Sequence, residues 1–91
     1  MLESADTLAL KALGWLAGQD DLLAIFMGAT GASGQDLRAR ADDPEFLASV
    51  LDFLLMDDAW VLAFCQAHGL PGEALMRARA ALPGGADPHW T

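Results

Sequence analysis

Apolar and polar residues follow helical spacing along most of the chain. In residues 5–18 the polar positions fall three or four apart, and the positions between them are apolar. Strand signals are weak, because the chain has no Tyr, two Val, one Ile and no alternating run. Ala and Leu, which both favour helices, dominate instead. The pattern predicts an all-α fold.

Start and stop signals divide the chain into six predicted helices. Ser4 precedes the first, and Asp43 followed by Pro44 marks the start of the fourth. Gly31 and Gly69 stand where left-handed caps would end the second and fifth. The predicted ranges are 5–18, 20–30, 34–41, 44–56, 58–68 and 71–82. They define a compact bundle of five to six short helices.

The segment 44–56 is the most apolar of the six. Only Glu45, Ser49 and Asp52 interrupt its apolar surface, which covers about 200° of the helical wheel against a usual stripe of about 100°. We therefore expect it at the centre of the bundle or at an interface. In the neighbouring segment 20–30 the side chains expected to point inward are Leu22, Leu23, Ile25 and Phe26.

An internal repeat is visible when residues 8–41 are shifted onto residues 46–79. Eight of the 34 aligned pairs are identical, where roughly three or four would match by chance in this composition. The identical pairs include Phe26 with Phe64 and Gly31 with Gly69. The repeat predicts two three-helix units that pack face to face.

Length and composition bound the function. The 91 residues make one domain, predicted over 1–83, with a flexible C-terminal tail at 84–91 that carries Trp90. The net charge of −8 argues against nucleic-acid binding and against an anionic membrane surface. Because 54% of the residues are hydrophobic, we expect either an unusually continuous core or an apolar surface that a second chain partly covers. One cysteine, no signal peptide and no membrane span predict a cytoplasmic protein.

No set of residues has the pattern of a catalytic or metal centre. Cys65 and His68 are helical neighbours, but no third group is identifiable that would activate a nucleophile. One Cys and two distant His do not supply a zinc site. Adjacent aspartates such as Asp57 and Asp58 fall at predicted helix starts, where they act as caps and dipole partners. We therefore expect no cofactor, no metal and no enzymatic activity.

The candidate interaction surface consists of cationic and aromatic residues. Two Arg-x-Arg stretches lie in the short helices 34–41 and 71–82, and the spacing predicts ion pairs from Asp36 to Arg40 and from Glu73 to Arg77. An aromatic in the tail is either an anchor for a partner or docked on its own bundle. The candidate residues are Trp60, Trp90, Arg38, Arg40, Arg77 and Arg79.

Several segments resemble a known protein family. They are 12–17 (Ala-Leu-Gly-Trp-Leu-Ala), 26–31, 36–38, 43–47, 50–54, 68–71 and 79–85. In these segments the chain resembles domain-of-unknown-function family 3572, a family of small alphaproteobacterial proteins. The resemblance spans nearly the whole chain and implies a helical, bacterial, cytoplasmic protein. It brings no catalytic residues with it.

The leading hypothesis is a small interaction module that binds another protein or a second copy of itself. The alternative is a helix-turn-helix-like regulator associated with nucleic acid, or an acidic decoy that occupies a basic groove. A third class is an enzyme of unknown reaction, which would require Cys65, His68 and a carboxylate to meet in one pocket.

Overall fold

Six α-helices build the computed structural model, which describes residues 4–82. No strand occurs within that range, so the predicted all-α class is confirmed. The helices are α1 (Ala5–Ala17), α2 (Asp20–Thr30), α3 (Gly34–Ala39), α4 (Pro44–Leu54), α5 (Asp58–His68) and α6 (Ala74–Ala81). The predictions for the tail 84–91 and for Trp90 lie outside the described residues.

Local capping chemistry sets most helix boundaries. Ser33 and Asp36 form the predicted capping box, in which each side chain accepts a hydrogen bond from the backbone N–H of the other residue. The carboxylate of Asp43 accepts a hydrogen bond from the Glu45 N–H, with Pro44 at the first helical position. Gly31 and Gly69 end α2 and α5 with φ of 76° and 65°. These caps confirm the start and stop signals in the sequence.

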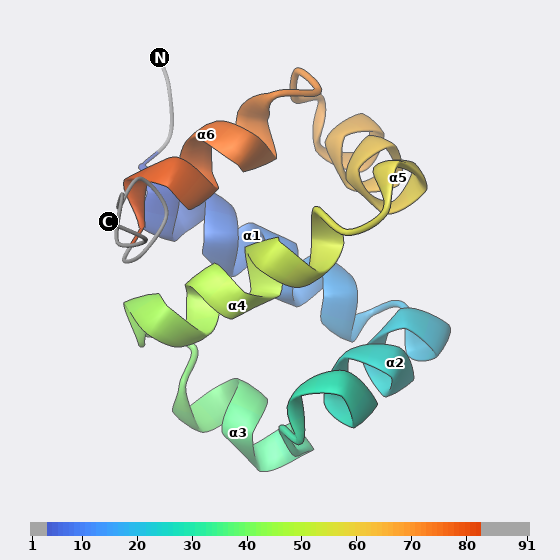
Figure 1. Ribbon diagram of the computed structural model, residues 1–91, viewed down its shortest axis with the longest axis vertical. Helices are drawn as coiled ribbons and strands as arrows, with labels where there is room; N and C mark the ends of the chain where they lie inside the picture. Colours follow the sequence, from blue (N-terminus) through green and yellow to red (C-terminus); the bar gives the residue numbers. More distant parts are fainter. Residues whose placement is uncertain (1–3, 83–91) are drawn as a thin grey trace, which may run out of the picture.

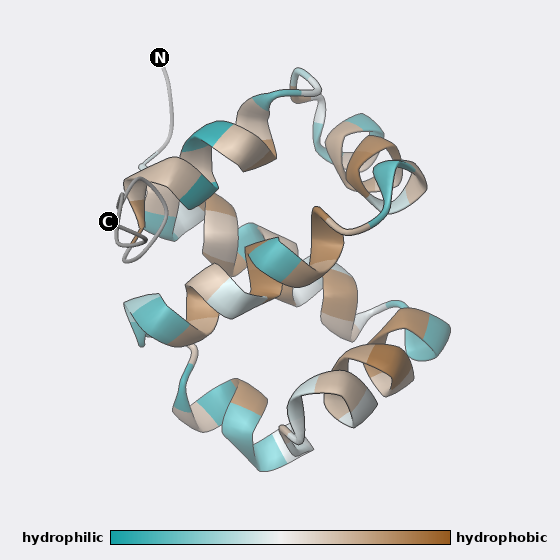
Figure 2. Ribbon diagram, viewed as in Figure 1, coloured by the Kyte–Doolittle hydropathy of each residue, from teal (hydrophilic) through white to brown (hydrophobic). Residues whose placement is uncertain are grey.

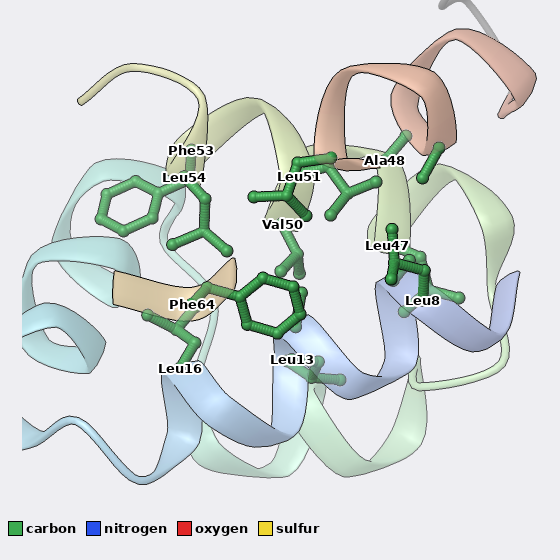
Figure 3. Packing of buried hydrophobic residues seen from close by; sticks show 14 of the residues in the cluster. Leu8, Leu13, Leu16, Leu47, Ala48, Val50, Leu51, Phe53, Leu54 and Phe64 are labelled. Carbon is green, nitrogen blue, oxygen red and sulfur yellow. The ribbon is translucent and has the colours of Figure 1, made fainter. Parts of the chain in front are cut away.

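The core lies where α1 and α4 cross at the centre of the molecule (Figure 1). As predicted, α4 is the most deeply embedded helix. Figure 3 shows its side chains meeting Leu13 and Leu16 of α1 and Phe64 of α5 in one apolar interior. The buried residues of α4 are Phe46, Leu47, Ala48, Val50, Leu51, Phe53 and Leu54.

The outer helices α2 and α5 are held by far fewer buried side chains. Phe26 is the one buried residue of α2, and its ring packs edge-on against Phe46 and Phe53 of α4. In α5 the buried residues are Phe64 and Cys65. Figure 2 shows apolar residues on the ribbons of both helices, well away from the crossing of α1 and α4. Each outer helix therefore has apolar side chains that the core does not cover.

Two local predictions were wrong. Ile25, expected to point inward, is 50% exposed, because the inward face of α2 is centred on Phe26. The sixth helix begins at Ala74 instead of Pro71, since residues 71–73 form a turn closed by a hydrogen bond from the Ala74 N–H to the Pro71 carbonyl. Gly72, within that turn, is a poor helix former.

The packing does not confirm the internal repeat. Helix α6 packs along both α1 and α4, whereas α3, its counterpart in the repeat, makes no comparable contact with either helix. The correspondence is clearer for the second helix of each unit. Phe26 of α2 and Phe64 of α5 are both buried, and both helices end at a left-handed glycine.

Candidate functional site

Cys65 is placed as a structural residue of the core. Its side chain is buried, and desolvation raises the pKa of its thiol above the ordinary value of 9.0. Burial therefore disfavours the thiolate that a nucleophile requires. The neighbouring His68 lies against the Phe64 ring, with the ring centroids 4.5 Å apart. Among residues 4–82, no three His, Cys, Asp or Glu side chains converge as a metal site would require.

Three of the four candidate arginines form ion pairs within the molecule. Arg77 pairs with Glu73, as the spacing predicts, at 3.7 Å. Arg79 instead reaches across to Asp52 and links α6 to α4. The predicted pair between Asp36 and Arg40 was wrong, because Asp36 caps α3 while Arg40 pairs with Asp43 at 3.2 Å. The arginines therefore do not gather into one cationic site.

Arg38 and Trp60, two further candidates, lie on different helices. Arg38 is exposed in the last turn of α3. Trp60 is half-buried in the first turn of α5, where its ring stacks on Phe53 with the centroids 4.8 Å apart. The predicted set of interaction residues is therefore divided over several parts of the surface.

A shallow polar cleft of about 280 Å³ lies between the end of α2, α3 and the start of α4. The two hydroxyl groups in its lining already donate to backbone carbonyls of the protein. The Thr30 hydroxyl donates to the Phe26 carbonyl at 2.8 Å, and the Ser49 hydroxyl donates to the Phe46 carbonyl at 2.6 Å. The cleft is lined by Thr30, Gly31, Ala32, Asp36, Arg40, Glu45, Phe46 and Ser49.

Arg40 and Asp43 hold the beginning of α4 beside this cleft. The Arg40 guanidinium lies 4.9 Å from the centre of the Phe46 ring. The hydrogen bond from the Glu45 N–H is the largest cause that lowers the pKa of Asp43 below 3.8. Desolvation opposes it, and the hydrogen bond and charge of Arg40 lower the pKa further. This arrangement stabilises the start of a helix.

A second surface combines exposed apolar side chains from three segments. Leu22 and Ile25 lie three positions apart on one side of α2, Met56 lies in the turn after α4, and Trp60 begins α5. Ile25 and Met56 are 50% and 75% exposed, whereas Leu22 and Trp60 are half-buried against the core. These four residues define what we call the α2–α5 surface. Figure 1 shows that α2 and α5 flank the C-terminal end of α4 on one side of the molecule.

Three aromatic rings in contact, one edge-on and two stacked, form the base of the α2–α5 surface. Phe53, near the end of α4, packs against Phe26 of α2 at a centroid distance of 5.3 Å and against Trp60 of α5 at 4.8 Å. Because Phe26 and Phe53 are buried, they fix the separation of the two outer helices. The surface therefore has packed aromatic rings beneath it, and its residues Ile25 and Met56 remain exposed to solvent.

The sequence identified only part of this surface. Trp60 was a candidate, but Ile25 was assigned to the core, and Met56 was placed inside a longer fourth helix. The usable signal for Ile25 is its position on the helical wheel of α2, beside Asp21 four residues earlier. For Met56 the signal is the Asp57-Asp58 pair that follows, which starts the next helix and places Met56 in a turn.

The described part of the chain is a small all-helical protein with an apolar surface that lies over packed aromatic rings. None of its helices combines the length and hydrophobicity needed to cross a membrane. Residues 2–85 match the model of a family described as Protein of unknown function (DUF3572), and the chain belongs to this family. This confirms the resemblance seen in the sequence, while the alphaproteobacterial origin stays a prediction. No curated protein and no solved structure matches the chain.

Proposed function

We propose that this protein works by binding another protein through the α2–α5 surface and that it is not an enzyme. The observation that carries the proposal is the exposure of Ile25 and Met56 on segments that the ring contacts of Phe53 with Phe26 and Trp60 bring together, beside two weakly anchored helices. Trp and Met are enriched at protein interfaces, and a Trp in a well-packed position is a usual anchor. The single cysteine, buried and reduced, supports a cytoplasmic setting for this binding.

The exposed side chains provide two matched pairs for a test. Ile25 and Leu10 are isomers with the same exposed fraction of 50%, and Leu10 lies on α1, outside the surface. Met56 and Met76 are 75% and 65% exposed, and Met76 lies on α6. The variant Ile25→Ser/Met56→Ser therefore removes the same apolar groups as Leu10→Ser/Met76→Ser, but from the α2–α5 surface. Circular dichroism checks that both variants fold.

The experiment compares wild type and both variants as bait in a lysate of the native host. We expect a host protein that is retained by wild type and by Leu10→Ser/Met76→Ser and lost with Ile25→Ser/Met56→Ser. Equal retention by both variants, or no retained protein at all, would contradict the proposal. If the partner is a second copy of the chain, sedimentation shows a dimer in place of the 9.6 kDa monomer, and only the Ile25→Ser/Met56→Ser variant dissociates it.

A further inference from the structure

Two pairs of aspartates neighbour residues of the α2–α5 surface. Helix α2 starts with Asp20 and Asp21, and α5 is capped by Asp57 and starts with Asp58. Neither 19–30 nor 57–68 contains a Lys or Arg. Asp21 lies one helical turn before Ile25, and Asp57 and Asp58 lie between Met56 and Trp60, so these carboxylates neighbour apolar residues of the surface.

Three arginines of the described chain pair with acidic residues elsewhere. Arg40, Arg77 and Arg79 pair with Asp43, Glu73 and Asp52, which lie on or next to α4 and α6. Within residues 4–82, no Lys or Arg forms an ion pair with the four aspartates of the surface. These four negative charges therefore lie beside exposed apolar side chains without a basic partner from the described chain.

We infer that the occupant of the α2–α5 surface is a basic amphipathic helix of a partner protein, an inference that rests on the proposed function. Its apolar stripe would cover Ile25, Met56 and Trp60, and its flanking Lys and Arg would face the four aspartates. Opposite charges around an apolar centre give both specificity and a fast encounter. A second copy of this chain would place like charges against one another.

The backbone favours a helical occupant. An extended peptide binds by adding a strand to a sheet edge, and residues 4–82 contain no sheet. An amphipathic helix instead needs an apolar surface that accepts side chains at helical spacing. The side chains on α2, on the α4–α5 turn and on α5 provide such a surface, with Phe53 beneath them.

The inference can be tested with a defined probe and charge-matched variants. The probe is a fluorescent Leu/Lys peptide with Leu at helical spacing, and two control peptides carry Glu in place of Lys or the same residues in scrambled order. Asp20→Asn/Asp21→Asn/Asp58→Asn removes three charges at the surface and keeps Asp57, whose carboxylate caps α5. Asp6→Asn/Asp42→Asn/Glu45→Gln removes three exposed charges elsewhere.

Fluorescence anisotropy at low salt should show binding of the Leu/Lys peptide alone. We expect affinity to fall about fivefold in Asp20→Asn/Asp21→Asn/Asp58→Asn, and less than about twofold in the control variant. Ile25→Ser/Met56→Ser should abolish binding, and Leu10→Ser/Met76→Ser should not. Equal losses in the two charge variants would overturn the inference, since they would show attraction to net charge alone.

Three further outcomes show whether the inference alone or the proposed function as well is wrong. If the Leu/Lys peptide does not bind, but a host protein is still lost with Ile25→Ser/Met56→Ser, the surface binds a partner of another chemistry and only the inference is wrong. If the wild type dimerises through the surface, a second copy is the occupant and the inference is also wrong. If neither the peptide nor a host protein responds to the surface variants, both are wrong.

Discussion

Two glycines of α2, three positions apart, have opposite backbone requirements. Gly28 lies inside the helix, and a Cβ built on it would meet no atom within 4 Å. Gly31 ends the helix with φ of 76°, and its N–H donates to the Met27 carbonyl at 2.8 Å. A side chain is thus favoured at the first position and strained at the second.

We predict that Gly28→Ala and Gly31→Ala change stability in opposite directions. Gly28→Ala should raise the free energy of unfolding by about 0.5–1 kcal/mol, because alanine is the better helix former. Gly31→Ala should lower it by about 1 kcal/mol, because a Cβ is strained in the left-handed conformation. Urea unfolding measures both, and a stabilised Gly31→Ala protein would contradict the cap geometry.

The stability of the start of α4 depends on the ionisation of one carboxyl group, that of Asp43. Its pKa is lowered in the folded protein, first by the Glu45 N–H and also by Arg40. A carboxyl group with a lowered pKa stabilises the fold above its unfolded value of 3.8, and this stabilisation is lost as the pH falls through the folded value. This loss of stability therefore occurs in acidic solution, below about pH 4.

Asp43→Asn should remove this pH dependence while keeping a capping side chain. We expect wild type to have a higher Tm than Asp43→Asn at pH 6, since the carboxylate also pairs with Arg40 at 3.2 Å. The difference should shrink as the pH falls below about 4. Thermal unfolding at pH 6 and below about pH 4 measures the difference in Tm. A difference in Tm that does not change with pH would show that the ionised form of Asp43 does not stabilise the fold.

At the scale of helices, α2 depends on one buried side chain. Phe26 joins it to both ends of α4 through Phe46 and Phe53, and the other apolar residues of the helix keep some contact with solvent. A helix of 11 residues is marginal in isolation, so tertiary contact must maintain it. Helix α4 contributes seven buried residues and has no such dependence.

Phe26→Ala should release α2 before the rest of the bundle. We expect the free energy of unfolding to fall by about 3–5 kcal/mol, with Leu62→Ala on the exposed side of α5 costing less than about 0.5 kcal/mol. Hydrogen exchange should show the amides of 20–30 losing protection while those of α4 keep theirs. Uniform loss of protection in all helices would mean that α2 unfolds only with the whole molecule.

The sequence predicted helix starts better than helix ends. The starts of α3 and α4 depend on Ser33, Asp36, Asp43 and Pro44, whose effects act within a few residues. Helix α4 was predicted to reach 56 but ends at Leu54, where the Met56 N–H donates to the Phe53 carbonyl and tightens the last turn. Stacking of Phe53 on Trp60 of the next helix accompanies this turn, and such a contact has no local signature.

At the scale of the molecule, apolar residues and charges are unevenly distributed. The crossing of α1 and α4 takes most of the buried side chains, and the ion pairs of Arg40, Arg77 and Arg79 lie around α4 and α6. The α2–α5 surface has exposed apolar groups and uncompensated aspartates together. Exposed apolar groups next to negative charges are the physical reason for proposing a basic amphipathic helix as the partner.

The sequence could predict an interface but not its location. An apolar excess of this size implies surface left uncovered, yet the helical wheel of α4 is even more apolar than those of α2 and α5. Only the packing shows that α1 and α6 cover α4 while Ile25 and Met56 stay in solvent. The arginines were placed on a candidate interface because their partners Asp43 and Asp52 were not identified from spacing alone.

Chemical-shift mapping of the folded protein with the Leu/Lys peptide tests the central claim most directly. The account predicts that the largest amide shifts fall in 20–27 and 55–61, with smaller shifts at Phe53 beneath the surface. Shifts centred instead on the polar cleft around Arg40 and Glu45, or spread evenly over all acidic residues, would contradict it.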